Sequence, residues 1–342
     1  MPIAARRVLR LSLTMALSLA AAYGFRAPLP YIAPIFALLL TAAPKPPMDP
    51  KGLLGLVTVV LVTLGIGLLV TPMLRNYPVS GVLMVTAGLY FSTYLAVNRG
   101  KGPVGTLLAI GFTLIPAAGI AEFALALGVI QSLVSAIVIA IACQWLTYPW
   151  FPEPPNVDEV RPSTVTVNTS NWIALRTALI VLPPLLLALS NPASYMPLIM
   201  KSVALGQQGS VVSARSAARE LLGSTALAGC FAAAFWFALK LHPNLWMFFL
   251  WTLVFGIYFA AKLYRVIATR LPASFWQNTA VTMFILLGPA VEDSATGTDV
   301  EAAFMTRMAL FVVVTLYACS AVYLLERVRN SRGPRIELSV NG

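Results

Sequence analysis

Four ionisable side chains lie inside or directly beside long apolar runs, where charge is costly. Lys201 lies near the middle of YMPLIMKSVALG, and Arg307 lies a turn or two inside the last apolar run. Glu292 and Asp293 follow Pro289 at the end of the run before it. A charged side chain at the centre of a membrane helix costs about 2.5–3.5 kcal/mol on insertion scales, so such groups are commonly functional. The cations could bind a carboxylate, and the acids could carry protons if burial raised their pKa.

Each of these groups also has a structural interpretation. The long stem of Lys201 could let its ammonium reach water at the membrane interface. Glu292 and Asp293 could belong to a solvated loop, and Arg307 could pair with the acidic segment VEDSATGTDVE before it. Glu122 stands in the corresponding place in the first half of the chain. It is therefore a further proton-coupling candidate with the same alternative.

Two tyrosines and one arginine complete the set of candidate substrate-binding residues. Tyr31 and Tyr195 stand at two matching, proline-rich apolar segments. An aromatic ring beside a cation would suit an aromatic carboxylate. Arg219 opens a later apolar run and could gather anions from the cytoplasm. Alternatively, Arg219 is simply one of the basic residues that orient a membrane protein.

The residue inventory argues against metal and covalent chemistry. Cys143, Cys230 and Cys319 lie in separate apolar runs without metal-ligand spacing, and His242 is the only histidine. No GxxxxGK[ST] phosphate loop is present in the sequence. An enzyme acting on lipid would have only the neighbouring carboxylates of residues 292 and 293 to use. We expect no metal, no cofactor and no enzymatic activity.

The composition is typical of a membrane protein with many spans. Of 342 residues, 59% are hydrophobic and 10% are charged, and the mean hydropathy is +0.83. Soluble domains carry about 25% charged residues. The net charge of +11 comes from basic residues that stand between apolar runs, which is the pattern of orientation in a membrane. Nucleic-acid binding is not expected.

The chain contains an internal repeat. PYIAPIFALLL parallels SYMPLIMKSVAL, KGLLG parallels RELLG, and GLYF parallels GIYF, at an offset of roughly 163 to 173 residues. Each copy holds six apolar tracts, the first six at residues 11–23, 29–43, 53–70, 79–97, 104–121 and 123–146, and the other six at 173–189, 193–205, 221–239, 245–261, 275–291 and 302–325. We therefore predict an all-α integral membrane protein of two parallel six-helix repeats, residues 1–148 and 172–328. Residues 149–171 form a proline-rich cytoplasmic linker, and residues 329–342 form a cytoplasmic tail.

The basic residues predict the orientation. Apart from Lys201 and Arg307, all Lys and Arg residues fall at one end of the twelve tracts except Arg26, Arg75 and Lys240. The positive-inside rule then places both termini in the cytoplasm. An even number of segments in each copy gives the two repeats the same orientation.

The second tract of each copy is short and interrupted by proline. Residues 29–43 and 193–205 fall below the roughly 20 residues that a regular helix needs to cross a bilayer. Paired short, proline-interrupted segments indicate the central site of a transporter. The count of spans is therefore about 12, or 10 if these two segments are re-entrant.

Two motifs carry a resemblance to a known family. RELLGSTALAG, a basic residue followed by a glycine-rich helix start, and the preceding segment opened by Tyr195-Met-Pro197 resemble the fusaric acid resistance and aromatic acid exporter superfamily. The chain looks like a compact branch of two membrane repeats without the cytoplasmic domain. The resemblance implies a multi-pass exporter of aromatic or other weak organic acids in the bacterial inner membrane, driven by the proton gradient. It also implies a periplasmic adaptor of the membrane-fusion type as partner.

The expected function is therefore proton-coupled export of a small organic anion. The alternative is a non-transporting membrane subunit that anchors an envelope or efflux assembly. A homo-oligomer is compatible with either.

Overall fold

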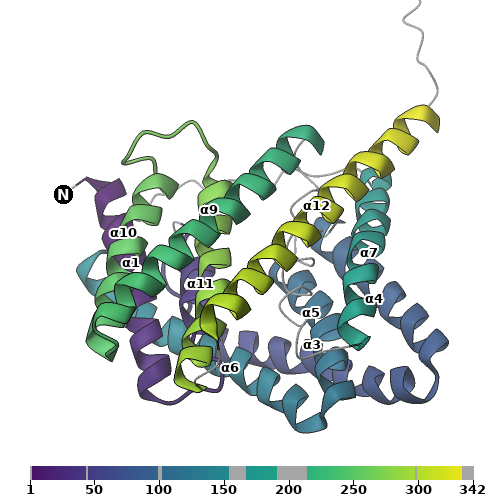
Figure 1. The fold of residues 1–342 in the computed structure, drawn as a ribbon, viewed down its shortest axis with the longest axis horizontal. Coiled ribbons are helices and arrows are strands. Elements are labelled where there is room, and N and C mark those ends of the chain that lie inside the picture. Colours follow the sequence, from purple (N-terminus) through teal and green to yellow (C-terminus); the bar gives the residue numbers. More distant parts are fainter. Residues whose placement is uncertain are drawn as a thin grey trace, which may run out of the picture.

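The computed structural model describes residues 2–43, 45–98, 102–153, 167–190, 214–296 and 299–332, which form α helices joined by turns (Figure 1). The helices are α1 (Ile3–Gly24), α2 (Ile32–Thr41), α3 (Pro50–Asn76), α4 (Pro78–Asn98), α5 (Gly102–Ala121), α6 (Phe123–Thr147), α7 (Val167–Ser190), α9 (Ala214–Leu241), α10 (Leu245–Leu263), α11 (Ala273–Thr296) and α12 (Val300–Arg332). A short 3-10 turn, η1 (Tyr148–Trp150), follows α6. The all-α prediction is confirmed for the described residues. Each described tract forms one helix, and the tract at 193–205 lies outside them.

Eight of the described helices are long and apolar enough to cross a membrane, namely α3, α4, α5, α6, α7, α9, α10 and α12. The prediction of a multi-pass membrane protein is therefore confirmed. Helices α1 and α11, with 22 and 24 residues, have comparable length. They are more polar, since α1 carries three arginines near its start and α11 carries Gln277 and Asn278 as well as two acids near its end.

The second segment of the first copy is short, as predicted. Helix α2 has 10 residues, and prolines explain its limits. Pro34 lies in its first turn, where the missing amide hydrogen has no partner within the helix. Pro28 and Pro30 disfavour the helical conformation at Ala27 and Leu29, so the helix does not extend back through this segment. Helix α7 begins at Val167, so the last residues of the predicted linker are helical.

Two apolar cores organise the bundle, and each takes a helix from the other half of the chain. One core joins α9, α10, α11 and α12 with Leu11, Met15 and Leu19 of α1. The other joins α3, α4, α5 and α6 with residues of α7, among them Val181 and Leu185. The first helix of each predicted repeat thus packs mainly into the other repeat's core.

Equivalent helix pairs make the principal contacts of both halves. Helix α3 packs on α5 as α9 packs on α11, and α1 packs on α10 as α7 packs on α4. The α1–α10 contact is close because Gly256 has no side chain. A Cβ atom placed there would lie 3.2 Å from the Cβ of Ser12. Small residues permit such close approach of membrane helices.

The bundle has two ends, which we call the N-terminal face and the opposite face. Helix α1 begins and α12 ends at the N-terminal face, towards the top of Figure 1. Tyr264, just after α10, donates a hydrogen bond to the carbonyl of Ala42, just after α2, so these two helices also end at that face. At the opposite face, the rings of Tyr23 and Phe248 lie 5.0 Å apart.

Candidate functional site: arginine–carboxylate clusters at the two faces

An ion pair joins α11 and α12 near the opposite face. The guanidinium of Arg307 donates to both oxygens of Asp293, from Nη1 at 2.5 Å and from Nη2 at 3.3 Å. The two side chains are 25% and 18% exposed. Two parallel bonds of this kind fix the orientation of a carboxylate as well as binding it. The pairing of Arg307 with the acidic segment before it, expected from the sequence, is observed.

Tyr31 brings the first half of the chain to this ion pair. Its ring lies directly on Gly288 of α11, where a Cβ atom would overlap the ring. Glu292 lies one turn further along α11, on the same side of the helix as Gly288. The charges of both Glu292 and Arg307 act on the hydroxyl of Tyr31. The turn before α2 and the ends of α11 and α12 therefore meet at one place.

A second tyrosine, Tyr23 at the end of α1, belongs to the same group. Its hydroxyl is buried, has no hydrogen-bond partner among the described residues, and is affected by the charge of Glu292. Tyr23 also lines a hollow of about 340 Å³, whose other walls include Asn244, Phe248 and Val291. We call Tyr23, Tyr31, Glu292, Asp293 and Arg307 the Arg307 cluster.

The Arg307 cluster has the chemical means to exchange anions and protons. A guanidinium holds one carboxylate in a two-bond arrangement that an external carboxylate could adopt. Two neighbouring acids, Glu292 and Asp293, provide groups that could take up a proton. Tyr23 offers an unused donor next to an apolar hollow.

The structure brings together four of the residues predicted from the sequence: Tyr31, Glu292, Asp293 and Arg307. Glu122 lies elsewhere, exposed between α5 and α6. The other predicted residues cannot be compared with the cluster, because Lys201 and Tyr195 lie outside the described residues and only the backbone of Arg219, in α9, is described.

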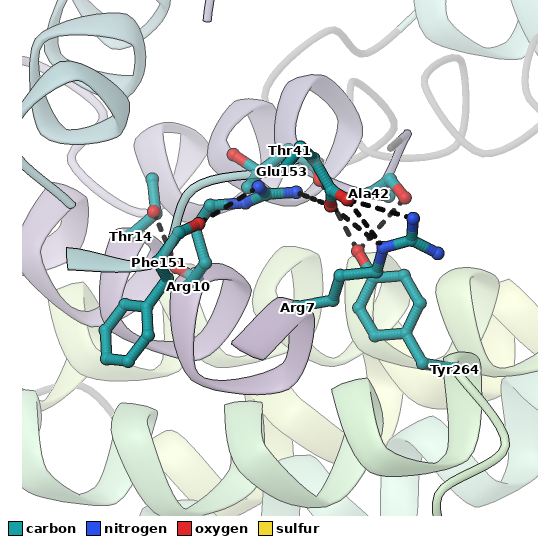
Figure 2. A network of polar contacts seen from close by, with 8 residues as sticks. All are labelled: Arg7, Arg10, Thr14, Thr41, Ala42, Phe151, Glu153 and Tyr264. Atoms are coloured by element: carbon teal, nitrogen blue, oxygen red, sulfur yellow. Dashed lines mark hydrogen bonds and ion pairs between the residues drawn. The ribbon is translucent and has the colours of Figure 1, made fainter. Parts of the chain in front are cut away.

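A second group of charges lies at the N-terminal face (Figure 2). Arg7 donates to Glu153 from Nε at 2.8 Å and from Nη2 at 2.9 Å, and Arg10 donates to the same carboxylate from Nη2 at 2.8 Å. Nη1 of Arg10 reaches the carbonyl of Phe151 at 3.3 Å, and its guanidinium lies 5.7 Å from the ring of Tyr148. We call Arg7, Arg10 and Glu153 the Arg10 cluster.

The Arg10 cluster keeps its carboxylate ionised. Burial by itself would raise the pKa of Glu153, but the hydrogen bonds and charges of Arg7 and Arg10 outweigh burial and hold that pKa below its ordinary value. Burial raises the pKa of the neighbouring Tyr264 to about 12, so its phenol stays protonated and can donate to the carbonyls of Thr41 and Ala42.

Sequence reasoning counted Arg7 and Arg10 only as orientation signals and did not consider Glu153. The repeat indicated a structural role beyond orientation for Arg10, because Arg10 and Arg176 stand at matching positions at the start of an apolar run. Both prove to be buried, with 1% and 4% of their surface exposed. Basic residues that merely orient a chain would be expected at the surface.

The first half of the chain has a recognisable sequence relationship. Residues 7–147 match a family described as "Protein of unknown function (DUF2955)". The matched range runs from the first turns of α1 to the end of α6, which is the extent of the first predicted repeat. That description names no activity, and nothing in it favours the aromatic acid exporter branch in particular. No curated protein and no solved structure matches the chain.

Proposed function

We propose that this chain is a proton-coupled transporter of aromatic or other weak organic acids, an exporter of the bacterial inner membrane, and that the Arg307 cluster forms part of its substrate site. The observation that supports this most strongly is the packing of Tyr31 on Gly288, close enough to Arg307, the partner of Asp293, for the charge of Arg307 to act on its hydroxyl. It joins the short segment of the first repeat to the last two helices of the second. Substrate sites of transporters commonly lie between repeats at broken segments.

The packing of the helices supports two parallel repeats of six segments. Corresponding pairs, α3–α5 with α9–α11 and α1–α10 with α7–α4, make the principal contacts of the two halves. The family match that ends with α6 agrees with a repeat of that length. In this proposal the N-terminal face is cytoplasmic, the anion enters near Arg219, and Lys201 contributes to the substrate site.

The proposed chemistry is a change of partner at Arg307. A substrate carboxylate would occupy the position that Asp293 now holds, and its ring would contact Tyr31. Protonation of Glu292 or Asp293 would couple transport to the proton gradient, because each protonation changes the charge that the substrate meets at Arg307. Movement of the two cores against each other would then expose the site to one face or the other.

The test is uptake of labelled benzoate into proteoliposomes under an imposed pH gradient, run with the gradient in both directions. Wild-type protein should transport more than protein-free vesicles, and Lys201→Met should lose that excess. No transport of any acid in a panel would favour the other function considered, a non-transporting subunit that anchors a periplasmic adaptor or another envelope assembly. Transport equal in both proteins would remove Lys201 from the site.

A further inference from the structure

We propose that Arg7 and Arg10 form a second carboxylate-binding site, at the N-terminal face, and that Glu153 occupies it in this structure in place of a small organic acid. The inference rests on the proposed function only for the role of the site in transport. The binding of a carboxylate can be tested without any transport.

The geometry is that of carboxylate recognition. The guanidinium of Arg7 presents two donors to Glu153, Nε to Oε1 at 2.8 Å and Nη2 to Oε2 at 2.9 Å. Arg10 adds a third bond to Oε1 at 2.8 Å. A free carboxylate has the same two oxygens at the same spacing, so these donors could bind it in the same arrangement. The planar fork of arginine is suited to this task.

The site has more positive charge and more donors than Glu153 uses. It contains two guanidinium groups and one carboxylate. The Arg10 side chain is 2% exposed, yet its Nε is buried without a hydrogen-bond partner among the described residues. Buried donors are nearly always paired in native proteins, so a ligand that pairs this atom is expected in some state. Arg10 is also among the largest fully buried side chains of the protein.

The position of the site links occupancy to the arrangement of the two cores. Arg7 and Arg10 belong to α1, whose apolar face packs into the core of α9 to α12. Glu153 follows α6, whose apolar residues belong mostly to the other core. Helices α1 and α6 pack directly on each other, and Thr14 hydrogen-bonds Thr147. The Glu153 carboxylate adds an ion pair to this contact at the N-terminal face, as Figure 2 shows for its bonds to α1. An acid that displaced Glu153 would remove this ion pair and so weaken the link between the two cores at that face.

The experiment is equilibrium binding of labelled acetate and benzoate to the purified full-length protein in detergent at pH 7. Glu153→Gln removes the competing charge and should bind both acids about tenfold more tightly than wild type, since bonds to charged groups are the strong ones. Adding Arg7→Gln to that variant should abolish the gain. Arg7 is suitable because its side chain is 22% exposed and tolerates replacement better than Arg10. Glu301→Gln, at an exposed glutamate of α12, is the matched control and should bind as wild type does.

Binding by Glu153→Gln that is no tighter than in wild type would overturn the inference. If Glu153→Gln does not fold, Glu153→Asp replaces it. Its carboxylate is one methylene shorter and should compete less well, so unchanged binding would again contradict the site. If wild type transports no acid but Glu153→Gln binds acetate more tightly than wild type does, the proposed function is refuted and this site is not. If wild type transports benzoate but Glu153→Gln binds acetate no more tightly than wild type does, this site alone is refuted.

Discussion

The ring of Tyr31 packs directly against Gly288, so the turn before α2 lies on the C-terminal half of α11. Any side chain at position 288 would occupy the space of the ring. This contact places the hydroxyl of Tyr31 within the influence of Glu292 and Arg307. One glycine thus determines how the first half of the chain reaches the charged residues of the second.

Gly288→Ala should therefore destabilise the protein by about 1–3 kcal/mol, the usual cost of overpacking a well-filled site. The measurement is thermal unfolding in detergent. Gly65→Ala in α3 is the control, because a Cβ atom there has nothing within 4 Å. That variant should be unchanged or slightly more stable, since alanine favours the helix. Equal melting temperatures for the two variants would show that Tyr31 does not pack as described.

Much of the fold could be predicted from the sequence, because a bilayer imposes strong rules on it. Apolar tracts of about 20 residues must be helical when no water can satisfy the backbone. The short helix α2 followed from its prolines. The exchange of α1 and α7 between the cores could not be predicted, since helices that pack through small residues show no distinctive periodicity. Gly256 opposite Ser12 is meaningful only once the partner helix is known.

The candidate site was predictable in part. Glu292, Asp293 and Arg307 attracted attention because charge is rare in apolar runs, and two of them proved to be paired. Tyr23 carried no signal, since a tyrosine near a helix end is normal at a membrane interface. Glu153 carried none either, because an acid in a polar linker gives no sign of a partner far away in the sequence.

The exchanged packing of α1 predicts a cross-link. Ser12→Cys with Gly256→Cys should form a disulfide, because the Cβ atoms would lie 3.2 Å apart, and a shift of a few tenths of an ångström brings them into the range of about 3.5–4.5 Å found in disulfides. The experiment uses protein without its native cysteines and with a protease site inserted in the linker. After cleavage the two halves should stay together on a non-reducing gel. Ser12→Cys alone is the control whose halves should separate, and separation of the halves in the double variant as well would contradict the packing of α1 on α10.

The Arg10 cluster predicts a dependence of stability on pH. The folded-state pKa of Glu153 is depressed, so its stabilising contribution is present above the pKa of an unfolded glutamate, about 4.3. It is lost as the pH falls through the depressed value. The unfolding free energy of wild type should exceed that of Glu153→Gln by about 3–5 kcal/mol at pH 7, a cost typical of breaking a buried pair. The difference in unfolding free energy should shrink below about pH 4, and a difference that is constant down to pH 3 would contradict the assignment.

The Arg307–Asp293 pair predicts coupling between its two members. In a double-mutant cycle of Arg307→Met and Asp293→Asn, the interaction free energy should be about 1–2 kcal/mol, because the pair is only partly exposed. Chemical or thermal unfolding of the four proteins gives this value. Additive effects would mean that the two side chains are stabilised separately.

The most direct test of the account is benzoate uptake by proteoliposomes containing wild type, Arg307→Met or Arg75→Met. Arg75 is the matched cation, since it is exposed in the last turn of α3, a helix that packs on α4, α5 and α6. The account predicts that wild type and Arg75→Met transport equally and that Arg307→Met loses most of its activity. Full transport by Arg307→Met, with wild type active, would contradict the assignment of the Arg307 cluster as the carboxylate site.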